Sequence, residues 1–258
     1  METLQVVTVS SDNYVKHTAV MLTSLLVNKE SSNPINIYVI GSISEKNQLK
    51  LNQSVERFGI VIKFFEVDPA LFESFKLTQY YKQEVYYRLL IPDLLEPEIK
   101  KAIYLDSDLI IRHDITNLWN IDIENYFLAA SRKSYLRNRR RALSIPYKYG
   151  CFNAGVMVIN LNKWREHNVY QLVIDYLIKN EKIIRFQEQD ALNGVLYNKY
   201  RNFNKTWNLT TTDLKFLGKK KINPSIIHYT GRKKPWRKRH RYQFEYFKYL
   251  EITHWNED

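Results

Sequence analysis

The segment KAIYLDSDLIIRHDI, residues 101–115, places two carboxylates between stretches that have the composition of buried strands. An apolar run leads directly into Asp106-Ser107-Asp108, and a second apolar run follows. An unpaired charge is costly to bury, so this placement calls for a compensating partner. Residues i and i+2 of an extended chain face the same side, which lets Asp106 and Asp108 aim at one point. Two hard oxygen ligands there suit Mn²⁺ or Mg²⁺, and the alternative is a strand-end turn with two solvated aspartates.

Strand and helix patterns alternate through the first half of the chain. Strands are predicted at residues 4–9, 35–40, 60–67, 102–105, 128–130 and 156–160. Helices are predicted at residues 14–28, 44–58, a segment ending at Pro92, 164–179 and 189–196. The alternation favours an α/β fold with a mainly parallel sheet flanked by helices. Ligands of such sheets lie beyond the carboxyl ends of the strands, where residues 10–13 and 106–108 supply polar clusters.

Length and composition indicate one large domain, because 258 residues with 45% hydrophobic side chains can build a sizeable core. No run approaches the roughly 18 apolar residues of a membrane-spanning helix. The N-terminus carries Glu2 and no basic region, so no secretory signal is expected. Cys151 is the only cysteine, which excludes an internal disulfide and favours a reducing, cytoplasmic compartment.

The net charge of +12 is concentrated in two basic patches. Residues 214–250 carry twelve Lys or Arg and one acid, Glu245, while residues 132–141 carry six Lys or Arg and no acid. The rest of the chain is mildly acidic, unlike a uniformly basic nucleic-acid-binding protein. Such patches attract phosphate, anionic lipid or acidic polymers.

Motifs elsewhere supply further candidate site residues. His228 ends a short predicted strand and is a candidate third metal ligand, and the nearby Gly231 and Lys234 belong to a basic turn that suits a diphosphate. The alternative is a structural histidine beside a solvated turn. The first strand–helix junction, residues 10–14, contains no glycine, which argues against dinucleotide-binding and P-loop motifs.

Two polar clusters precede or begin regular elements: Asn153-Ala154-Gly155, ahead of an apolar strand, and Glu188-Gln189-Asp190, at the start of a helix. The first permits a close backbone approach. The second places Gln189 and Asp190 near the reacting centre if its turn faces the cleft. An ordinary turn and ordinary acids at a helix start are the alternatives.

In chain order these motifs resemble glycosyltransferase family 8, the retaining, nucleotide-sugar-dependent enzymes that include bacterial lipopolysaccharide galactosyl- and glucosyltransferases and glycogenin. The segments that carry the resemblance are residues 10–14, VYYRLLIPDLL, AIYLDSDLII, FNAGVMVINLNKWRE, EQDALN and IIHYTGRKKPW. The resemblance implies a GT-A (Rossmann-like) catalytic domain over residues 1–236 and a basic, aromatic tail over residues 237–258. It also implies a UDP-hexose donor, glucose or galactose, used with Mn²⁺, and a saccharide, glycolipid or glycoprotein acceptor rather than nucleic acid.

The resemblance assigns roles to individual positions of this chain. Metal ligands are Asp106, Asp108 and His228. Donor contacts are Ser10, Ser11, Asp12, Asn13 and Tyr14 at uridine and ribose, with Ser107, and Gly231 and Lys234 at the diphosphate. Positions around the transferred sugar are Arg88, Asn153, Ala154, Gln189 and Asp190. Because Gln189 is an amide and a poor nucleophile, same-face attack with a UDP oxygen as base is favoured over double displacement.

The chain departs from the family pattern at two places. Glu188 stands where the family often has Asp, so its carboxylate is one methylene longer. Arg132 and Lys133 stand where the family tends to have an Asp after the strand 128–130, which suggests a different sugar or an acidic acceptor. The loop 132–141 is expected to touch the acceptor.

The tail alternates cations with aromatic rings, and two interpretations stay open. It suits an anionic membrane surface, which would make the enzyme peripheral on the inner face of the membrane. Otherwise its aromatic rings pack on the body. Rival functions are a haloacid-dehalogenase-type phosphohydrolase, which also uses Asp-x-Asp after an apolar strand, and a non-enzymatic module that binds membrane or RNA through the basic patches.

Overall fold

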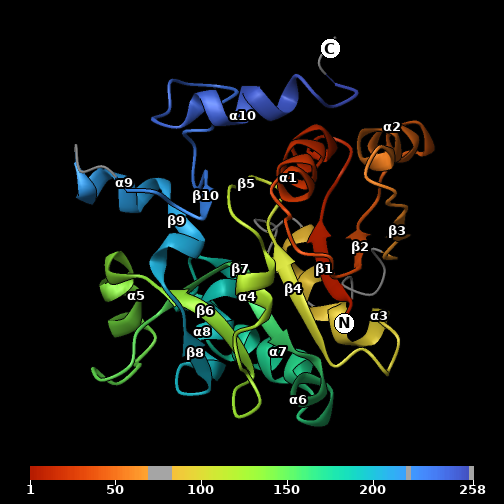
Figure 1. Cartoon of the computed structure of the whole chain (residues 1–258). Helices are drawn as coiled ribbons and strands as arrows, with labels where there is room; N and C mark the ends of the chain where they lie inside the picture. The colour runs from red at the N-terminus through yellow and green to blue at the C-terminus, as the bar shows by residue number, and fades with distance from the viewer. Residues whose placement is uncertain (69–82, 219–221, 256–258) are drawn as a thin grey trace.

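The computed structural model describes residues 1–68, 83–218 and 222–255. Within these ranges the chain forms a seven-stranded sheet in the order β3-β2-β1-β4-β7-β6-β8 and a three-stranded sheet in the order β5-β10-β9 (Figure 1). The strands of the large sheet are β1 (Leu4–Val9), β2 (Ile35–Ile40), β3 (Ile62–Phe65), β4 (Lys101–Leu105), β6 (Leu128–Arg132), β7 (Phe152–Asn160) and β8 (Tyr200–Asn202). The strands of the small sheet are β5 (Leu109–Ile111), β9 (Leu209–Thr210) and β10 (Ile226–His228).

One strand of the large sheet runs against its neighbours. β7 pairs antiparallel with β4 and β6, whereas β1 is parallel to β2 and β4, β2 to β3, and β6 to β8. The carboxyl ends of β1, β4, β6 and β8 therefore share one edge with the amino end of β7. Polar side chains that follow these strands meet at this edge, which is where open α/β sheets bind ligands.

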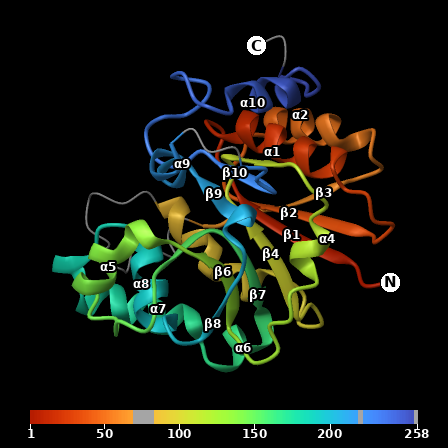
Figure 2. The same ribbon diagram turned by 60° about the vertical axis from the view of Figure 1, so that its left-hand side comes forward.

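Helices cover both faces of the large sheet (Figures 1 and 2). α1 (Val15–Val27) and α2 (Glu45–Glu56) follow β1 and β2 and lie side by side, as right-handed crossovers require. The other face carries a 3₁₀ helix (Gln83–Leu90), α3 (Ile91–Leu94), α6 (Leu161–Glu166), α7 (Val169–Lys179) and α8 (Gln187–Leu196). Shorter helices are α4 (Thr116–Trp119), α5 (Arg137–Ala142) and α9 (Thr211–Leu217). The predicted α/β fold with a mainly parallel, helix-flanked sheet is confirmed.

The central strands are buried on both faces, which explains their continuous apolar runs. Residues 102–105 of β4 and 156–159 of β7 are at most 1% exposed. Strands sandwiched between helices need apolar side chains on both faces, so they show no alternation of polar and apolar residues. Because β4 is buried up to its last residue, Leu105, Asp106 passes directly from a buried strand to the polar edge of the sheet.

Three predicted elements differ from the structure. The predicted helix 164–179 is wrong as a single helix, because Asn168 takes a left-handed conformation with φ 44° and separates α6 from α7. β7 begins at Phe152, so Asn153-Ala154-Gly155 lie inside the strand rather than ahead of it. β3 is shorter than the predicted 60–67.

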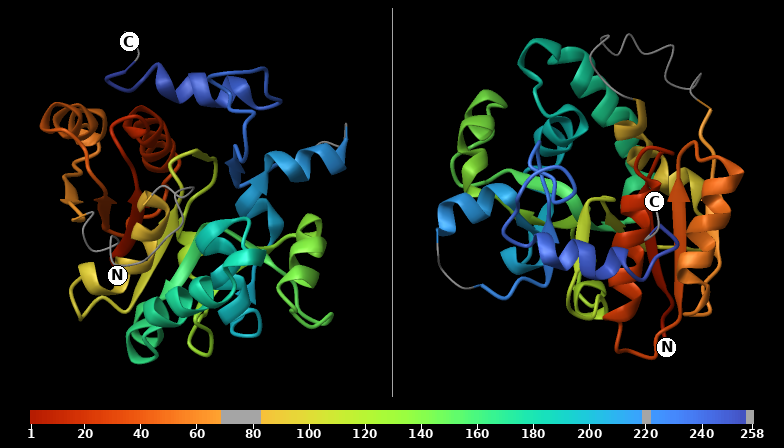
Figure 3. Two further views of the ribbon diagram at one scale, coloured as in Figure 1. Left: turned by 180° about the vertical axis from the view of Figure 1, so that it is seen from behind. Right: turned by 90° about the horizontal axis from the view of Figure 1, so that it is seen from above.

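The tail contains α10 (Gln243–Leu250), which packs on α1 (Figure 3). Tyr246 and Tyr249 are each 2% exposed and join Val20 and Ile110 in a small apolar cluster. Tyr246 Oη lies 2.6 Å from His17 Nδ1, and Asn28 Nδ2 donates to Tyr249 Oη at 2.7 Å. The tail therefore packs part of its aromatic face on the body. Across the described residues, no helix combines the length and apolarity needed to span a bilayer.

Candidate active site

Asp106, Asp108 and His228 converge at the polar edge of the sheet. One ligand atom from each lies within 4.8 Å of the others. His228 Nε2 is 3.4 Å from Asp106 Oδ2 and 3.2 Å from Asp108 Oδ1. The antiparallel pairing of β10 with β5 sets His228 opposite Leu109, which immediately follows the aspartates. Residues more than a hundred positions apart in sequence are thereby brought to one point.

The orientation of His228 suits a metal ligand. Its Nδ1 lies 2.9 Å from Asn208 Oδ1, and because an amide oxygen only accepts, Nδ1 carries the proton. Nε2 then presents its lone pair to the two carboxylates, as histidine ligands held by a hydrogen bond at the other nitrogen do. Burial would lower the pKa of His228, but Asp108 and Asp106 outweigh it and raise the pKa.

Gly155 makes the convergence possible. A Cβ at this position would lie 2.3 Å from His228 Cε1 and 2.4 Å from Asp106 Oδ2. Both distances are far below van der Waals contact, so any side chain would push the two ligands aside. The close backbone approach predicted for this motif is therefore present, inside β7, and Gly155 O also accepts from Asp106 N at 2.9 Å.

Arg88 forms an ion pair with Asp106. The guanidinium lies 3.2 Å from Asp106 Oδ1 and 3.4 Å from Glu188 Oε1, and it stacks over the Tyr104 ring at 4.5 Å. Tyr104 Oη also donates to Asp106 Oδ1 at 2.8 Å. Burial opposes ionisation of Asp106, yet the positive charge of Arg88 and the hydrogen bond from Tyr104 hold its pKa well below the usual range. Burial raises the pKa of Glu188 to about 7, although Arg88 opposes the rise.

A chain of side-chain amides leads from His228 to α8. Asn208 Nδ2 donates to Asn153 Oδ1 at 2.9 Å, and Asn153 Nδ2 donates to Gln189 Oε1 at 2.8 Å. Gln189 Oε1 also accepts from Ala154 N at 3.1 Å. The predicted Asn153 and Gln189 are thus brought together with the metal-ligand group by a residue that the sequence analysis did not single out.

Asp190 is engaged elsewhere. It is 2% exposed, its Oδ2 lies 2.5 Å from Arg139 Nη2, and it accepts from the backbone N–H groups of Arg185 and Phe186. These contacts tie the start of α8 to α5. Its predicted place near the transferred sugar stays a prediction.

A cavity of about 350 Å³ opens beside the aspartates. The predicted donor-binding residues that line it are Ser10, Ser11, Tyr14, Arg88, Asp106, Ser107, Asp108 and Lys234. Lys234 pairs with Asp108 Oδ2 and donates to Tyr229 O at 2.6 Å, after a turn in which Gly231 has φ +74°. Gly231 itself is exposed.

Asp12 and Asn13 do not line this cavity. Asp12 Oδ1 accepts from Ser44 N at 2.8 Å and from Asn47 Nδ2 at 2.9 Å, so it stabilises the start of α2. The hydrogen bond from Asn47 is the largest influence on the pKa of Asp12, which is lowered. Asn13 is exposed.

Comparison with known proteins decides the family. The sequence model of "Glycosyl transferase family 8" matches residues 5–240. This chain belongs to glycosyl transferase family 8. It is 34% identical to "General stress protein A" of Bacillus subtilis (strain 168), over 99% of this chain and 96% of that protein. It is 27% identical to the "Lipopolysaccharide 1,2-glucosyltransferase" of Escherichia coli (strain K12), over 95% of this chain and 77% of that protein.

The fold agrees with the family. The structure of the galactosyltransferase LgtC in complex with donor and acceptor sugar analogs superimposes with a TM-score of 0.85 and 25% identity, covering 96% of this chain and 95% of LgtC. The chain therefore has the GT-A fold and is a glycosyltransferase, as expected. Family membership decides against the phosphohydrolase and the non-enzymatic module.

Three residues that complete the site were missed by sequence reasoning. Asn208 and Tyr104 hold His228 and Asp106, and Glu188, noted only as a departure from the family, pairs with Arg88. Tyr104 was detectable, because it lies two residues before Asp106 in an extended strand and so faces the same side. Nothing local in sequence marks Asn208, which joins the site only through the pairing of β9 with β10.

Proposed function

We propose that this enzyme transfers a hexose, glucose or galactose, from a UDP-sugar to a saccharide, glycolipid or glycoprotein acceptor with retention of anomeric configuration. The observation that carries the proposal is the convergence of Asp106, Asp108 and His228 beside the cavity that Tyr14 and Lys234 line. Relatives support it in kind: one is described as a lipopolysaccharide 1,2-glucosyltransferase and another as a lipopolysaccharide 1,3-galactosyltransferase.

The three converging residues would hold Mn²⁺ or Mg²⁺. Two carboxylates and an imidazole lone pair form a donor set that these cations accept, and Gly155 leaves room for the ligands to approach. When bound, the cation supplies Lewis-acid stabilisation of the diphosphate leaving group. The Lys234 ammonium adds positive charge where departing UDP gathers negative charge.

Same-face attack fits this site better than double displacement. The bond from the anomeric carbon to UDP breaks, the bond to the acceptor oxygen forms on the same face, and a UDP phosphate oxygen takes the acceptor proton. Potential nucleophiles are already engaged: Gln189 Oε1 accepts two hydrogen bonds, Glu188 pairs with Arg88, and Asp190 pairs with Arg139. A covalent sugar adduct on Gln189 or Asp190, detected by mass spectrometry, would contradict this mechanism.

A hydrolysis panel tests the donor assignment without knowledge of the acceptor. UDP-glucose, UDP-galactose, UDP-N-acetylglucosamine and GDP-mannose are incubated with the protein and Mn²⁺, and nucleotide release is measured. We expect slow release from UDP-glucose or UDP-galactose that stops with EDTA and returns with excess Mn²⁺. Release from GDP-mannose alone, or release that EDTA leaves unchanged, would refute the proposal.

For the tail we propose contact with an anionic membrane surface, which would make this enzyme peripheral on the cytoplasmic face. Phe244 and Phe247, three residues apart on α10, are 78% and 38% exposed. Lys248, four residues after Phe244, lies on the same helix face. Exposed rings beside cations suit lipid headgroups.

Vesicle sedimentation tests this contact. Phe244→Ala/Phe247→Ala is expected to lower binding to phosphatidylglycerol vesicles about tenfold, because it removes two rings that become buried in the lipid surface on binding. Phe186→Ala, which removes a 49% exposed ring from another surface, serves as the matched control. Equal binding of all three proteins would exclude the tail as the membrane contact.

A further inference from the structure

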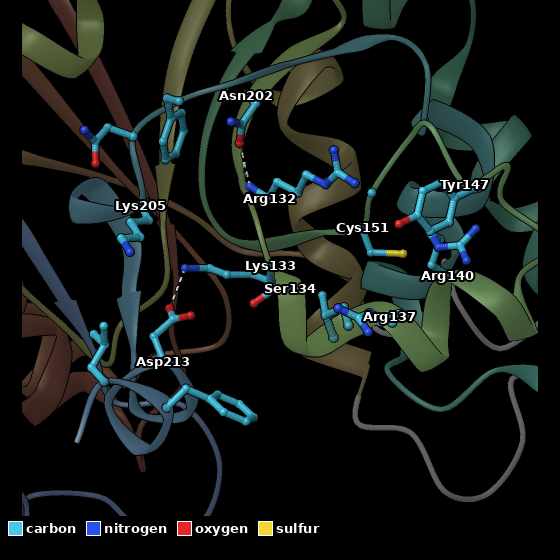
Figure 4. Close-up of a pocket in the computed structure, with 16 residues that line it drawn as sticks. Arg132, Lys133, Ser134, Arg137, Arg140, Tyr147, Cys151, Asn202, Lys205 and Asp213 are labelled. Carbon is cyan, nitrogen blue, oxygen red and sulfur yellow. Dashed lines mark hydrogen bonds and ion pairs between the residues drawn. The ribbon is translucent and has the colours of Figure 1, made fainter.

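A second cavity, of about 670 Å³, lies beyond the carboxyl ends of β6 and β8 (Figure 4). Its walls come from residues 132–140 at the end of β6 and in α5, residues 147–151 before β7, residues 202–205 at the end of β8, and α9. Because the carboxyl ends of β4 and β6 share one edge of the sheet, this cavity opens on the same edge as the metal-ligand group. Nothing in the donor site described above uses it.

The cavity wall is strongly basic. Arg132, Arg137, Arg140 and Lys205 line it, and the only acid among its described lining residues, Asp213, is already paired with Lys133 at 2.7 Å. Across residues 1–68, 83–218 and 222–255, no acid forms an ion pair with any of those four cations. Their charge is therefore available to an anionic ligand.

The cations are placed rather than merely abundant. A Cβ at Gly150 would lie 2.0 Å from Arg132 Nε, so glycine is needed for Arg132 to lie along the wall. Arg132 Nη2 also donates to Tyr149 O at 3.4 Å. Arg140 Nη1 donates to Ile145 O at 2.7 Å, and its guanidinium lies over the Tyr147 ring at 5.2 Å. Figure 4 shows Arg137 beside Arg140 and Lys205 across the cavity from them.

Two aromatic rings at the cavity offer flat apolar faces. Tyr147 is 84% exposed and Phe216 is 74% exposed, so both rings are accessible to a ligand in the cavity. Cavities that combine aromatic faces with a few convergent polar groups are typical ligand sites. A sugar ring has apolar C–H faces that suit such rings.

The cavity is linked to the metal-ligand group through Lys133 and Asn208. Lys133, 3% exposed, donates from Nζ to the backbone carbonyl of Asn208, whose side chain bonds His228 and Asn153. The buried pair of Lys133 with Asp213 therefore forms the partition between the two. A ligand in the basic cavity would lie against Lys133, which Asn208 links to His228.

We infer that this cavity is an acceptor subsite for a saccharide that carries a phosphate or carboxylate group. The anionic group contacts the cations of the cavity wall, which include Arg137 and Lys205 on opposite sides, and the sugar ring packs on Tyr147 or Phe216. That the bound saccharide is the acceptor rests on the proposed function, but its binding does not require turnover. The test below therefore separates failure of the subsite from failure of the donor assignment.

The experiment measures binding of matched sugars by ligand-observed NMR and titration calorimetry, with UDP and Mn²⁺ present at saturation. The probes are glucose, glucose 6-phosphate, glucuronic acid and inorganic phosphate. We expect glucose 6-phosphate, glucuronic acid or both to bind at least tenfold more tightly than glucose and than inorganic phosphate. Preference for glucose 6-phosphate identifies a phosphate ligand, and preference for glucuronic acid identifies a carboxylate ligand.

Variants locate the binding. Arg137→Ala/Lys205→Ala removes two exposed cations and is expected to lower the affinity for the anionic sugar about tenfold or more, because charge-assisted hydrogen bonds are lost. UDP-sugar hydrolysis stays within twofold of wild type. Lys46→Ala, which removes an exposed cation of α2 outside the cavity, is the matched control and binds like wild type.

Three results would overturn the inference: equal affinity for glucose and both anionic sugars, unchanged affinity in Arg137→Ala/Lys205→Ala, or inorganic phosphate binding as tightly as the phosphorylated sugar. Absence of UDP-sugar hydrolysis in the wild-type protein refutes the donor assignment instead, and the binding results stand apart from it.

Discussion

The metal-ligand group and the basic cavity lie at one edge of one sheet, but they differ in whether their charged side chains are paired within the protein. Around Asp106 and Asp108, each carboxylate has a cationic or hydrogen-bonding partner, and the nearby His228 is 2% exposed. In the basic cavity, Arg137 and Lys205 are exposed and have no acidic partner within the described chain. The charged side chains of the metal-ligand group already have partners within the protein, whereas the cations of the basic cavity are free to bind an anionic ligand.

This difference corresponds to two tasks. Stabilisation of a leaving group needs donors that are fixed before the reaction, since reorganisation would consume their effect. Recognition of a varied acceptor needs side chains that adapt, and long exposed cations on the segments that follow strands do so. Mutations should therefore affect catalysis strongly in the first region and substrate choice in the second.

The largest effect is expected for Asp108→Asn. The amide cannot replace a carboxylate that faces both His228 and Lys234, so UDP-sugar hydrolysis should fall by about 10²- to 10³-fold. Asp93→Asn, at an exposed position on α3, is the control and should keep wild-type rates. Hydrolysis by Asp108→Asn above one-tenth of the wild-type rate would show that the metal-ligand group is not the donor site.

A second prediction concerns the partition between the regions. Lys133→Met removes a buried ammonium and leaves Asp213, 15% exposed at its side chain, without its ion pair. Breaking one side of such a pair typically costs about 3 kcal/mol, so the free energy of unfolding in urea should fall by about that amount. Arg201→Met breaks an exposed pair with Asp122 and should cost below about 1 kcal/mol. Equal costs for the two variants would mean that the partition is not a rigid element.

The sequence predicted the fixed region better than the adaptable one, for a physical reason. β1 and β2 have the predicted bounds, because strands buried on both faces are rich in apolar and β-branched residues. Asp106 and Asp108 follow such a run directly, so their common direction could be derived from the strand geometry. The family motifs then brought His228 to them from far along the chain.

The basic cavity could not be assembled from the sequence, although its residues were visible as a basic patch. Its walls come from four separate segments, and the pairing of β6 with β7 and β8 brings three of them together, while the fourth, α9, follows β9 of the small sheet. The sequence treated Arg132 and Lys133 alike, but Lys133 is neutralised by Asp213 and Arg132 is not. The ion pair depends on the position of α9, whose capping box uses Asp213 and Thr210. No local sequence pattern predicts that Asp213 contacts Lys133.

A third prediction tests how closely the fixed region is packed. Gly155→Ala would place a methyl group against His228 and Asp106, so Mn²⁺ affinity measured by calorimetry should fall about 10- to 100-fold, as when groups that orient metal ligands are changed. Gly194→Ala is the matched control, because its Cβ would lie 2.2 Å from the Tyr176 ring, away from the metal-ligand group. That variant should lose stability and keep Mn²⁺ affinity. Wild-type affinity in Gly155→Ala would mean that the ligands can shift freely.

The smallest predicted effect is a pH dependence of stability that arises where α10 of the tail packs on His17 of α1. His17 stacks on Trp236 at 3.6 Å and bonds Tyr246, and burial lowers its pKa to about 4, although Asp108 opposes the shift. Because the folded pKa lies below the ordinary value of 6.5, the unfolded chain binds the proton first as pH falls. The contribution of His17 to stability is therefore complete above about pH 6.5 and declines toward pH 4, with about 1 kcal/mol lost at pH 5.5.

Urea unfolding at pH 7.5 and pH 5.5 measures this loss. In His17→Gln the difference in unfolding free energy between the two pH values should shrink by about 1 kcal/mol, because the side chain no longer titrates. Some dependence should remain, since burial also lowers the pKa of His240 to about 4. His254→Gln, an exposed histidine of the same tail, should keep the wild-type profile. An unchanged profile in His17→Gln would mean that the packing of His17 against Trp236 and Tyr246 is insensitive to this proton.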